Sequence, residues 1–527
     1  MKAAPSPAAR VSTRHVSAAA TSLVALAALL AISAERTRTQ QPPTGRPDIV
    51  IVMADDLDVG SLDTAVDEGL MPNLVRYVLE AGTKFTESFV SLSLCCPSRS
   101  TFLTGLYAHN HGVVRNSGAS GGFSAFQRHF DGSAPLARWL EEGGYRTAHV
   151  GKYLNGYTDY TVVPRGWTEW RALVDASTYC MYNYRISKNG TELLDYAADP
   201  SEPADEYQTD VLARLAEDIV STSDTRPLFL SIAPLAPHRE SSCLPSTIRP
   251  APRHVGTVDL PLPAPPSFNE GDMSDKPRWM RRLPPRNPVA LRALYNDRIA
   301  ALRAVDDLIG TVASALRAAG RLDRTAFMFT SDNGYVLGPH RWESKILLYE
   351  ESIRIPLAVR LPGGANRPTV GRFALHTDLA PTIADLARVR PDFAVDGRSL
   401  VPLVRGADPQ WRQRFLVEYP PIHGSAAAAL ALDFDMARPF AEALPPFHAV
   451  RTGGAHERPR LVYAETLETT GALVTDRELY DLDVDPFQQQ SLHNDRSPGR
   501  VLQQRVLKQH LEALKTCGAG TCQTLEE

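Results

Sequence analysis

Three short apolar runs, each followed by polar residues, mark out the first part of the chain. They cover residues 48–53, 228–233 and 326–330 and are rich in β-branched and aromatic side chains. Continuous apolar runs of this length are typical of strands that are buried on both faces of a parallel sheet. Open α/β sheets place their ligand sites at the carboxyl ends of such strands. The pattern therefore predicts a parallel sheet and a site where the polar residues after the three strands meet.

Between these runs, apolar residues recur at three- and four-residue spacing. This spacing predicts amphipathic helices that cover the sheet. The expected helices span residues 71–80, 135–142, 205–219 and 296–319. The alternation of strands and helices predicts an α/β fold, and we assign residues 48–385 to this N-terminal domain.

The pattern changes twice further along the chain. Between residues 244 and 289 there are eleven prolines and little periodicity, which predicts a long ordered loop or lid. Beyond residue 363 we expect a helix at 375–387, strands at 415–419, 448–452 and 461–465, and a final helix at 501–514. These elements predict a smaller C-terminal α+β domain with an antiparallel sheet, which we assign to residues 386–527.

Composition narrows the class of protein. Hydrophobic residues make up 43% and charged residues 22% of the chain, which is near the average for globular proteins and argues against wholesale disorder. The 56 basic and 60 acidic residues leave a net charge of -4. Since this balance lacks the basic excess of nucleic-acid-binding proteins, we expect no nucleic-acid partner.

The N-terminus has the pattern of an export signal over residues 1–34. Basic residues precede an almost unbroken run of small and apolar residues at 18–34, which is too short to span a bilayer comfortably. We expect cleavage near Ala34 and a polar linker at 35–47; the alternative is an uncleaved N-terminal anchor. The pattern predicts a secreted or extracytoplasmic protein (periplasmic, cell-surface or lysosome-like) that meets the membrane only through this signal.

The cysteines are consistent with export, because disulfides persist in oxidising compartments. The chain has six cysteines: Cys95, Cys96, Cys180, Cys243, Cys517 and Cys522. The last two can close a small loop, and Cys180 with Cys243 can close a larger one. Neighbouring cysteines pair only with considerable strain, so the adjacent Cys95 and Cys96 need another explanation.

The string from Cys95 to Gly105 carries the most information. Pro97 suits the first turn of a helix, and Gly105 suits its end. The unsatisfied N–H groups at a helix N-terminus attract anions, and Arg99 adds a positive charge on the same side of the first turn. This arrangement favours an oxyanion ligand.

The string also resembles the sulfatase signature C-x-P-S-R-x-x-x-L-T-G, with Cys95 first and Gly105 last. In that family the signature cysteine is oxidised to formylglycine (3-oxoalanine), whose hydrated aldehyde is the nucleophile. The resemblance implies that a formylglycine-generating enzyme converts Cys95 and that Cys96 is a bystander. It also implies an alkaline-phosphatase-like fold, with a large, mainly parallel sheet between helices and a smaller C-terminal antiparallel sheet. The alternative for the two cysteines is a buried thiol pair in a helix cap.

Acidic residues after the predicted strands suggest a metal site. Asp55 and Asp56 follow the first strand, and Asp332 and Asn333 follow a later one. Their hard oxygen atoms suit Ca²⁺ or Mg²⁺, between which the sequence does not decide. The resemblance assigns all four to a calcium site together with an oxygen of the formylglycine at position 95. For Asp55 and Asp56 alone, a helix cap is the alternative.

The segment around Lys152 resembles the G-K-Y-L-N element of the glucosamine-6-sulfatase branch, which makes Lys152 a candidate sulfate contact. Many arylsulfatases have a histidine two residues after this lysine, and it contacts the formylglycine hydroxyl. Leu154 stands there in this chain, so that role is vacant or filled by another group, for which His149 and Asn155 are candidates. The alternative for Lys152 is an ordinary surface lysine.

Two further residues match family elements. His238 lies in an A-P-H element and is expected to protonate the leaving alkoxide or to bind sulfate. Lys345 resembles the second sulfate-binding lysine. The alternatives are a loop histidine that caps a carbonyl and a solvated lysine. We expect Cys95, Arg99, Lys152, His238 and Lys345 to form the catalytic set.

Substrate contacts are expected from residues near these motifs. His340 and Arg341 precede Lys345 and are candidates for lining a sugar pocket. Asn116, with His109 and His111, follows the signature helix and is a candidate for facing the substrate; packing is the alternative for each.

These expectations lead to one functional hypothesis. The chain is expected to be an exported, calcium-dependent sulfuric ester hydrolase that acts on a sulfated small molecule or sulfated sugar, of the aryl or glucosamine-6-sulfate type. One alternative is a phosphate or phosphonate ester hydrolase on the same scaffold. The other is a non-catalytic carbohydrate-binding relative, which Leu154 favours and the remaining site residues oppose.

Overall fold

The computed structural model describes Met1, Ala4 and residues 45–196, 206–243, 247–364, 368–421, 444–454, 458–471 and 473–527. The predicted export signal therefore lies almost entirely outside the described residues. Residues 44–527 form one compact unit. Among the helices of the described residues, none is both long enough and apolar enough to cross a membrane.

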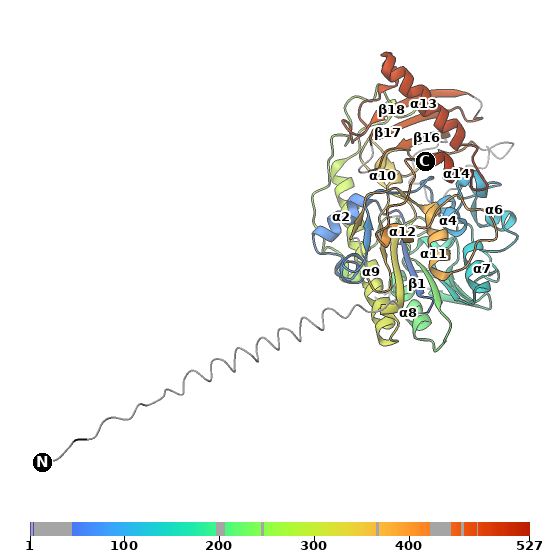
Figure 1. Ribbon diagram of the computed structural model, residues 1–527, viewed down its shortest axis with the longest axis vertical. Coiled ribbons are helices and arrows are strands. Elements are labelled where there is room, and N and C mark those ends of the chain that lie inside the picture. Colours follow the sequence, from blue (N-terminus) through green and yellow to red (C-terminus); the bar gives the residue numbers. More distant parts are fainter. Residues whose placement is uncertain are drawn as a thin grey trace. The chain divides into compact units, whose positions relative to one another are not determined.

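A ten-stranded sheet runs through this unit (Figure 1). In order across the sheet its strands are β13 (Thr369–Val370), β2 (Thr83–Phe85), β12 (Leu357–Arg360), β9 (Thr325–Ser331), β1 (Asp48–Ala54), β8 (Leu228–Ala233), β4 (Arg146–Gly151), β5 (Glu169–Leu173), β6 (Tyr184–Lys188) and β7 (Glu192–Tyr196). The five strands from β9 to β5 are parallel. The three strands predicted from their apolar runs are β1, β8 and β9, which are direct neighbours. Their carboxyl ends therefore meet at one edge, as expected.

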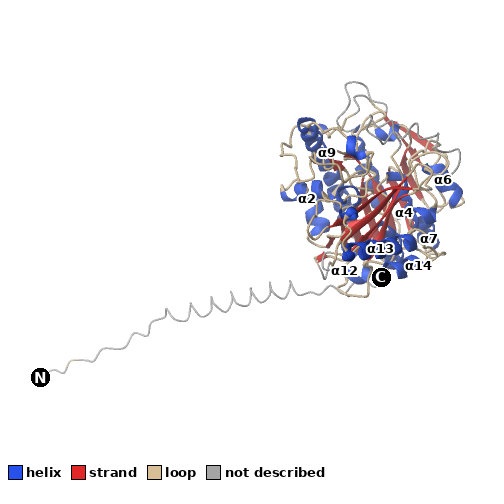
Figure 2. Ribbon diagram, turned by 90° about the horizontal axis from the view of Figure 1, so that it is seen from above, coloured by secondary structure: helices blue, strands red, loops and turns tan. Residues whose placement is uncertain are grey.

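Helices cover both faces of the sheet (Figure 2). In chain order, the α-helices of the described residues are α2 (Val59–Asp67), α3 (Pro72–Leu74), α4 (Cys95–Thr104), α5 (Ala108–His111), α6 (Gly122–His129), α7 (Pro135–Glu142), α8 (Gln208–Ser221), α9 (Pro288–Ala318), α10 (Glu350–Ile353), α11 (Leu379–Ala387), α12 (Val401–Val404), α13 (Pro498–Leu514) and α14 (Thr521–Glu526).

The residues of β1 alternate between two hydrophobic clusters. Val50 and Val52 belong to the cluster that contains the apolar residues of α8 and α9. Ile49 and Ile51 belong to the cluster that contains those of α4, α7 and α11. Because successive side chains of a strand point to opposite faces, this alternation is why the strand is apolar throughout.

Two predicted helices differ most from their expected bounds. The helix expected at 71–80 is the short α3 followed by a π-helical segment, Val75–Leu79. The helix expected at 296–319 begins earlier, at Pro288. Proline suits a first helical turn, and the side chain of Asn287 caps it by accepting hydrogen bonds from the N–H groups of Val289 and Ala290.

A second, antiparallel sheet follows in the sequence, coloured red at the top of Figure 1. Its strands are β15 (Arg414–Tyr419), β16 (Phe447–Thr452), β17 (Leu461–Leu467) and β18 (Val474–Asp481). Leu507 and Leu511 of α13 pack in one hydrophobic cluster with Phe415 and Val450 of this sheet. The mainly parallel and antiparallel sheets confirm the expected fold class. The domain boundary between residues 385 and 386 stays a prediction.

Two pairs of very short strands complete the sheet structure of the described residues. They are β3 (Ser88–Phe89) with β14 (Ala374–Leu375), and β10 (Val336–Leu337) with β11 (Glu343–Ser344). The hairpin of β10 and β11 lies directly before Lys345.

The proline-rich segment 244–289 is an ordered loop where it is described, with short 3-10 turns at Pro252–His254 and Met280–Arg282. It packs on the β10–β11 hairpin. The Asn269 N–H donates to the Gly338 carbonyl at 3.0 Å, and the His340 N–H donates to the Ser267 carbonyl at 2.8 Å. The segment therefore supports the loop that leads to Lys345.

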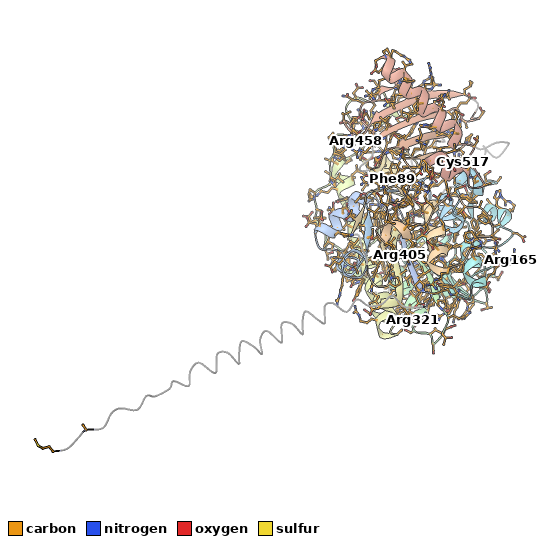
Figure 3. All side chains as sticks on the ribbon, viewed as in Figure 1. Phe89, Arg165, Arg321, Arg405, Arg458 and Cys517 are labelled. Atoms are coloured by element: carbon orange, nitrogen blue, oxygen red, sulfur yellow. A yellow bond between two sulfur atoms is a disulfide. The ribbon has the colours of Figure 1, made fainter. Side chains whose placement is uncertain are left out.

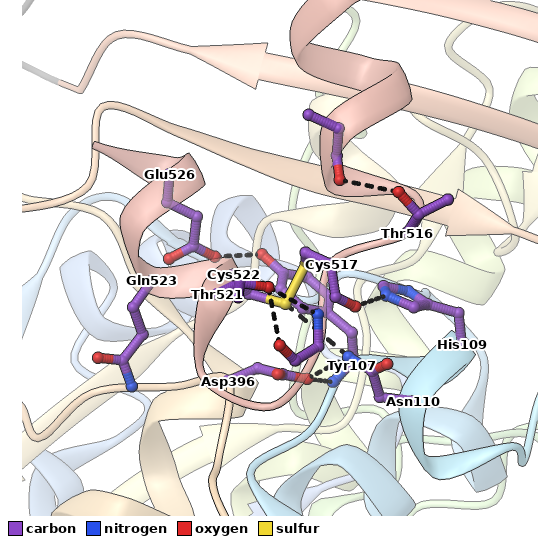
Figure 4. Close-up of a disulfide and its surroundings, with 12 residues drawn as sticks. Tyr107, His109, Asn110, Asp396, Thr516, Cys517, Thr521, Cys522, Gln523 and Glu526 are labelled. Carbon is purple, nitrogen blue, oxygen red and sulfur yellow. Dashed lines mark hydrogen bonds between the residues drawn. A yellow bond between two sulfur atoms is a disulfide. The ribbon is translucent and has the colours of Figure 1, made fainter.

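Both predicted disulfides are present, Cys180–Cys243 and Cys517–Cys522. Figure 4 shows the second, whose loop contacts residues 107–111 after α4. The His109 Nε2 lies 3.0 Å from the Cys517 carbonyl oxygen, and its Nδ1 lies 3.1 Å from the Glu418 carboxylate. Burial alone would lower the pKa of His109, but Glu418 and the Cys517 carbonyl raise it to about 9. This histidine thus joins the C-terminal loop to the main sheet domain.

At the amino end of β1, a buried ion pair fixes the sheet. The Asp48 carboxylate accepts hydrogen bonds from Arg321, labelled in Figure 3, at 2.9 and 2.7 Å, and from the Leu228 N–H at 2.8 Å.

We expect Asp48→Asn to lower the free energy of unfolding by about 3 kcal/mol, because the variant leaves a buried arginine without its counter-charge. Urea unfolding measures this difference, and Asp323→Asn, at a side chain that is 79% exposed, is the control. Equal unfolding midpoints for both variants would show that the Asp48–Arg321 ion pair does not stabilise the fold.

The His109–Glu418 pair predicts a pH dependence of stability. Because the pKa of His109 lies above its usual value of 6.5 in the folded state, its contribution is complete below that pH and is lost as the pH rises through about 9. We expect His109→Gln to lower the free energy of unfolding by on the order of 2 kcal/mol near pH 6 and by much less near pH 10. Urea unfolding at both pH values measures this change in the free energy of unfolding. His129→Gln, at an exposed side chain, is the control. A difference independent of pH would refute the charged pair.

Candidate active site

The candidate site lies where the carboxyl ends of the parallel strands meet the start of α4. The predicted metal and catalytic residues come from six different elements. Asp55 and Asp56 come after β1, Lys152 after β4, His238 after β8, Asp332 and Asn333 after β9, and Lys345 after β11, while Cys95 and Arg99 lie in the first turns of α4. All nine side chains are buried. The fold thus brings these predicted residues together from across the sequence.

The thiol of Cys95 lies at the centre of the group. It donates to Asp55 Oδ1 at 3.4 Å and lies 4.0 Å from Asp56 Oδ1. The Lys345 ammonium donates to Cys95 Sγ at 2.8 Å and to Asp56 Oδ1 at 2.7 Å. The neighbouring Cys96 belongs to a hydrophobic cluster, so the two thiols lie in different surroundings. The first cysteine of the pair is therefore the one that faces charged groups.

Buried positive charges balance the carboxylates. Lys152 Nζ donates to Asp55 Oδ2 at 2.6 Å, and Arg99 bridges Asp332 at 2.9 Å and Asp55 at 3.3 Å. Burial alone would raise the pKa of Asp55, but the charges of Lys152, His238, Arg99 and Lys345 lower it well below its usual value. Burial and the charge of Asp55 raise the pKa of Asp332. The site therefore holds closely spaced charges of both signs away from water.

Asp56 has an unusual backbone. Its φ of 61° is in the left-handed region, which is uncommon for a residue other than glycine. The Asp56 N–H donates to Asp332 Oδ1 at 3.1 Å, and the buried Arg298 of α9 donates to the Asp56 carbonyl. The Arg298 guanidinium also lies 4.3 Å from the ring centroid of Tyr335. These contacts hold Asp56 in a conformation that aims its carboxylate at Cys95 and Lys345.

Several side chains are arranged to hold a cation. Donor atoms of Asp55, Asp56, Cys95 and His238 all lie within 4.8 Å of one another. Asn333 Nδ2 donates to Asp56 Oδ1 at 2.6 Å, while Asn333 Oδ1 is buried and has no hydrogen-bond partner among the described residues. Buried oxygens without a donor suit a hard divalent cation. The predicted ligand residues thus fit a metal site.

The imidazole of His238 is fixed by its neighbours. Its Nδ1 lies 2.6 Å from the Arg239 carbonyl, which only accepts, so this nitrogen carries a proton. Its Nε2 lies 3.5 Å from Asp56 Oδ2 and points into the site. The second nitrogen is therefore the one able to exchange a proton with a bound molecule.

Tyr179 is a site residue that was not predicted from the sequence. Its ring centroid is 4.8 Å from Lys152 Nζ and 5.5 Å from that of His238, and its hydroxyl accepts a hydrogen bond from Asn155 Nδ2 at 2.6 Å. The ring thus lies against two of the predicted catalytic side chains. No motif contains Tyr179, and its only sequence signal is the adjacent disulfide cysteine, Cys180.

Leu154 does not face this polar cluster but lies in a hydrophobic cluster. Of the two candidates for the missing histidine's role, Asn155 is joined to the site through Tyr179. His149 instead packs against Tyr153 and two tryptophans, and burial with the charge of Arg99 lowers its pKa to about 3. His149 is therefore neutral in the folded protein.

Arg298 is a second missed residue, although the sequence contained a signal for it. It occupies the apolar face of α9, where the buried residues Leu291, Tyr295, Leu302 and Val305 recur at three- and four-residue spacing around it. A charged residue on the apolar face of a predicted helix needs a buried partner. That partner is the backbone of Asp56.

The predicted substrate contacts have definite places. Asn116 Oδ1 accepts a hydrogen bond from the Cys96 N–H at 2.9 Å, at the start of α4. His340 Nδ1 lies 2.7 Å from Glu270, and its ring stacks on Tyr349. The Arg341 guanidinium donates to three backbone carbonyls of the proline-rich segment. Substrate binding by Asn116, His340 and Arg341 stays a prediction.

Comparison with known proteins identifies the family of the chain. A family model described as sulfatase matches residues 47–389. The chain is 30% identical over 525 residues to the arylsulfatase of Volvox carteri, a match that covers 90% of this chain and 76% of the relative. It is 34% identical over 397 residues to the N-acetylglucosamine-6-sulfatase of Homo sapiens, covering 71% of this chain and 68% of the relative.

The fold is also similar to a solved structure, that of BT4656 in complex with its substrate D-glucosamine-2-N,6-O-disulfate. The TM-score is 0.67 at 21% identity, and the match covers 89% of this chain and 97% of the other. This likeness confirms the expected fold. The family match over most of the chain, together with the two relatives, shows that the protein belongs to the sulfatase family, the hydrolases of sulfuric esters.

Proposed function

We propose that this protein hydrolyses sulfate monoesters with a formylglycine formed from Cys95 and with a bound divalent cation, Ca²⁺ or Mg²⁺. The observation that carries the proposal is the position of the Cys95 sulfur, within 4.0 Å of two buried carboxylates and 2.8 Å from a lysine ammonium. A hydrated aldehyde at this position supplies two hydroxyl groups on one carbon, so that one attacks sulfur and deprotonation of the other releases sulfate.

The surrounding cations fit the charge of a sulfate ester. Lys152, Lys345 and Arg99 converge on the acidic groups around Cys95 and present buried positive charge to a tetrahedral oxyanion. Such groups stabilise negative charge strongly because no water screens them. In this proposal they bind the sulfate oxygens, and His238 donates a proton from Nε2 to the leaving alkoxide.

The cation is assigned to Asp55, Asp56, Asp332 and Asn333. The buried Asn333 Oδ1, which has no hydrogen-bond partner among the described residues, supports this ligand set. All four are oxygen donors, which favours calcium or magnesium over softer metals. Bound by these four residues, a divalent ion would supply positive charge that stabilises the negative charge developing in the reaction.

The substrate is proposed to be an aryl sulfate or a sulfated sugar of the glucosamine-6-sulfate type. The proteins named arylsulfatase and N-acetylglucosamine-6-sulfatase among the relatives support both types. Phosphate esters are also tetrahedral oxyanions, so an aryl phosphate is the necessary comparison substrate. The buried cations and metal ligands around Cys95 are unexpected for a protein that only binds carbohydrate.

Maturation and location follow from the same proposal. Conversion of Cys95 requires a formylglycine-generating enzyme. The two disulfides support an extracytoplasmic location, because oxidising compartments preserve such bonds.

The adjacent cysteines provide a matched test. We expect Cys95→Ala to lower kcat for an aryl sulfate by about 10⁴-fold or more, since a nucleophile is removed. Cys96→Ala is the control and should retain activity, because this thiol lies on the hydrophobic side. Mass spectrometry of the wild-type peptide should show a residue about 18 mass units lighter than cysteine at position 95. Unmodified thiol in fully active enzyme, or a strong preference for aryl phosphate, would contradict the proposal.

Arg298 provides a test of the metal site. We expect Arg298→Leu to weaken calcium binding by about 10-fold, because groups that orient metal ligands typically contribute this much. Isothermal titration calorimetry of the metal-free enzyme measures the affinity, and circular dichroism checks the fold. Arg303→Leu on the same helix is the control, since Arg303 bonds to Thr257 instead. Equal calcium affinity in both variants would show that Arg298 does not position Asp56.

A further inference from the structure

An ion pair lies at the partly exposed edge of the site. Arg239 directly follows His238, and Glu343 precedes Lys345 by two residues. The Arg239 guanidinium lies 3.0 Å from Glu343 Oε1, and the two side chains are 29% and 20% exposed. Both neighbouring site residues, His238 and Lys345, are buried. The pair therefore marks the point where the buried cluster approaches solvent.

The backbone holds Arg239 against a residue of the site, because its carbonyl oxygen lies 2.6 Å from Nδ1 of His238. His238 and Lys345 are buried, whereas the side chains of Arg239 and Glu343 are partly exposed. The ion pair is therefore the part of these two segments that a molecule from solvent can contact.

The pair has unused hydrogen-bonding capacity. Arg239 Nε is buried and has no hydrogen-bond partner among the described residues. A guanidinium has five N–H donors, and a carboxylate accepts at both oxygens, so one ion pair leaves several positions open. Neighbouring ring hydroxyls of a sugar both donate and accept, which matches an arginine beside a glutamate.

We propose that Arg239 and Glu343 form the sugar-binding edge of the site, where the guanidinium donates to, and the carboxylate accepts from, adjacent hydroxyl groups of a sulfated sugar. The inference rests on the proposed function, because the buried cations hold the sulfate of the same molecule. The two residues determine specificity and do not act on the reacting atoms. An aryl sulfate has no hydroxyl groups for this edge to bind, so the edge favours sugar sulfates.

The local structure holds both residues in place. Glu343 begins β11 and lies opposite Leu337 of β10, so its backbone is fixed by the hairpin. Arg239 is flanked by His238 and by Glu240, whose carboxylate accepts from the Met181 N–H at 2.6 Å. The segment that begins here reaches Cys243, which the disulfide ties to Cys180. A binding edge needs this rigidity to distinguish substrates.

The test compares two substrates, glucosamine-6-sulfate and nitrophenyl sulfate, in the matured enzyme. We expect Arg239→Ala and Glu343→Gln each to lower kcat/KM for the sugar by about 10- to 100-fold, as expected when a hydrogen bond to a charged group is lost. The ratio of the sugar value to the aryl value should fall at least about 10-fold, mainly through KM. Arg372→Ala is the matched control, because Arg372 is 30% exposed and pairs with Asp408 at 2.9 Å. Arg372→Ala should leave kcat/KM unchanged for both substrates.

Each other outcome has a definite meaning. Equal losses on both substrates would assign the pair to sulfate binding or to folding, which thermal unfolding distinguishes, and would overturn the inference. Unchanged sugar kinetics, or a wild-type enzyme active on the aryl sulfate alone, would also overturn it. Failure of the proposed function gives a different result: the wild-type protein carries formylglycine and calcium but hydrolyses neither the sugar sulfate nor the aryl sulfate.

Discussion

The structure depends on the burial of three carboxylates at one edge of the sheet. Asp55, Asp56 and Asp332 follow the neighbouring strands β1 and β9 and are shielded from water. A buried carboxylate is strongly disfavoured unless positive charge is buried with it, so the fold requires Arg99 and the two lysines nearby. The same cations, held in a dry site, are suited to stabilise a sulfate ester. In the proposed function, one set of residues therefore meets both the electrostatic requirement of the fold and that of the reaction.

Each cation reaches the site from a different part of the chain, and each is held by a different feature. Arg99 is fixed by α4 and donates to the Lys152 carbonyl as well as to Asp332. Lys152 follows a central strand and has the ring of Tyr179 beside it. Lys345 follows a short hairpin that the proline-rich segment supports. Because the supports are independent, the positions of the charges are set by the whole sheet domain rather than by one loop.

The sequence predicted the parts of this arrangement that depend on local pattern. The strands β1, β8 and β9 were evident because they are apolar throughout. Their polar residues were expected to meet because each group follows the carboxyl end of a strand in a parallel sheet. Contacts between distant residues have no such local signal. The cation–π contact of Lys152 with Tyr179 joins residues 27 positions apart, and the bond from Arg298 to the Asp56 carbonyl joins residues 242 positions apart. Only the folded chain brings these residues together.

The division between buried and partly exposed residues also separates two chemical tasks. Any sulfate ester presents the same tetrahedral anion to the buried cations, so these cannot distinguish one ester from another. Discrimination requires groups that contact the rest of the molecule, and such groups have to be accessible to it. In the described part of the chain, Arg239 and Glu343 combine partial exposure with direct sequence proximity to His238 and Lys345. In this proposal, substrate choice therefore depends on the rim of the site, where changes in sequence leave the buried charge balance intact.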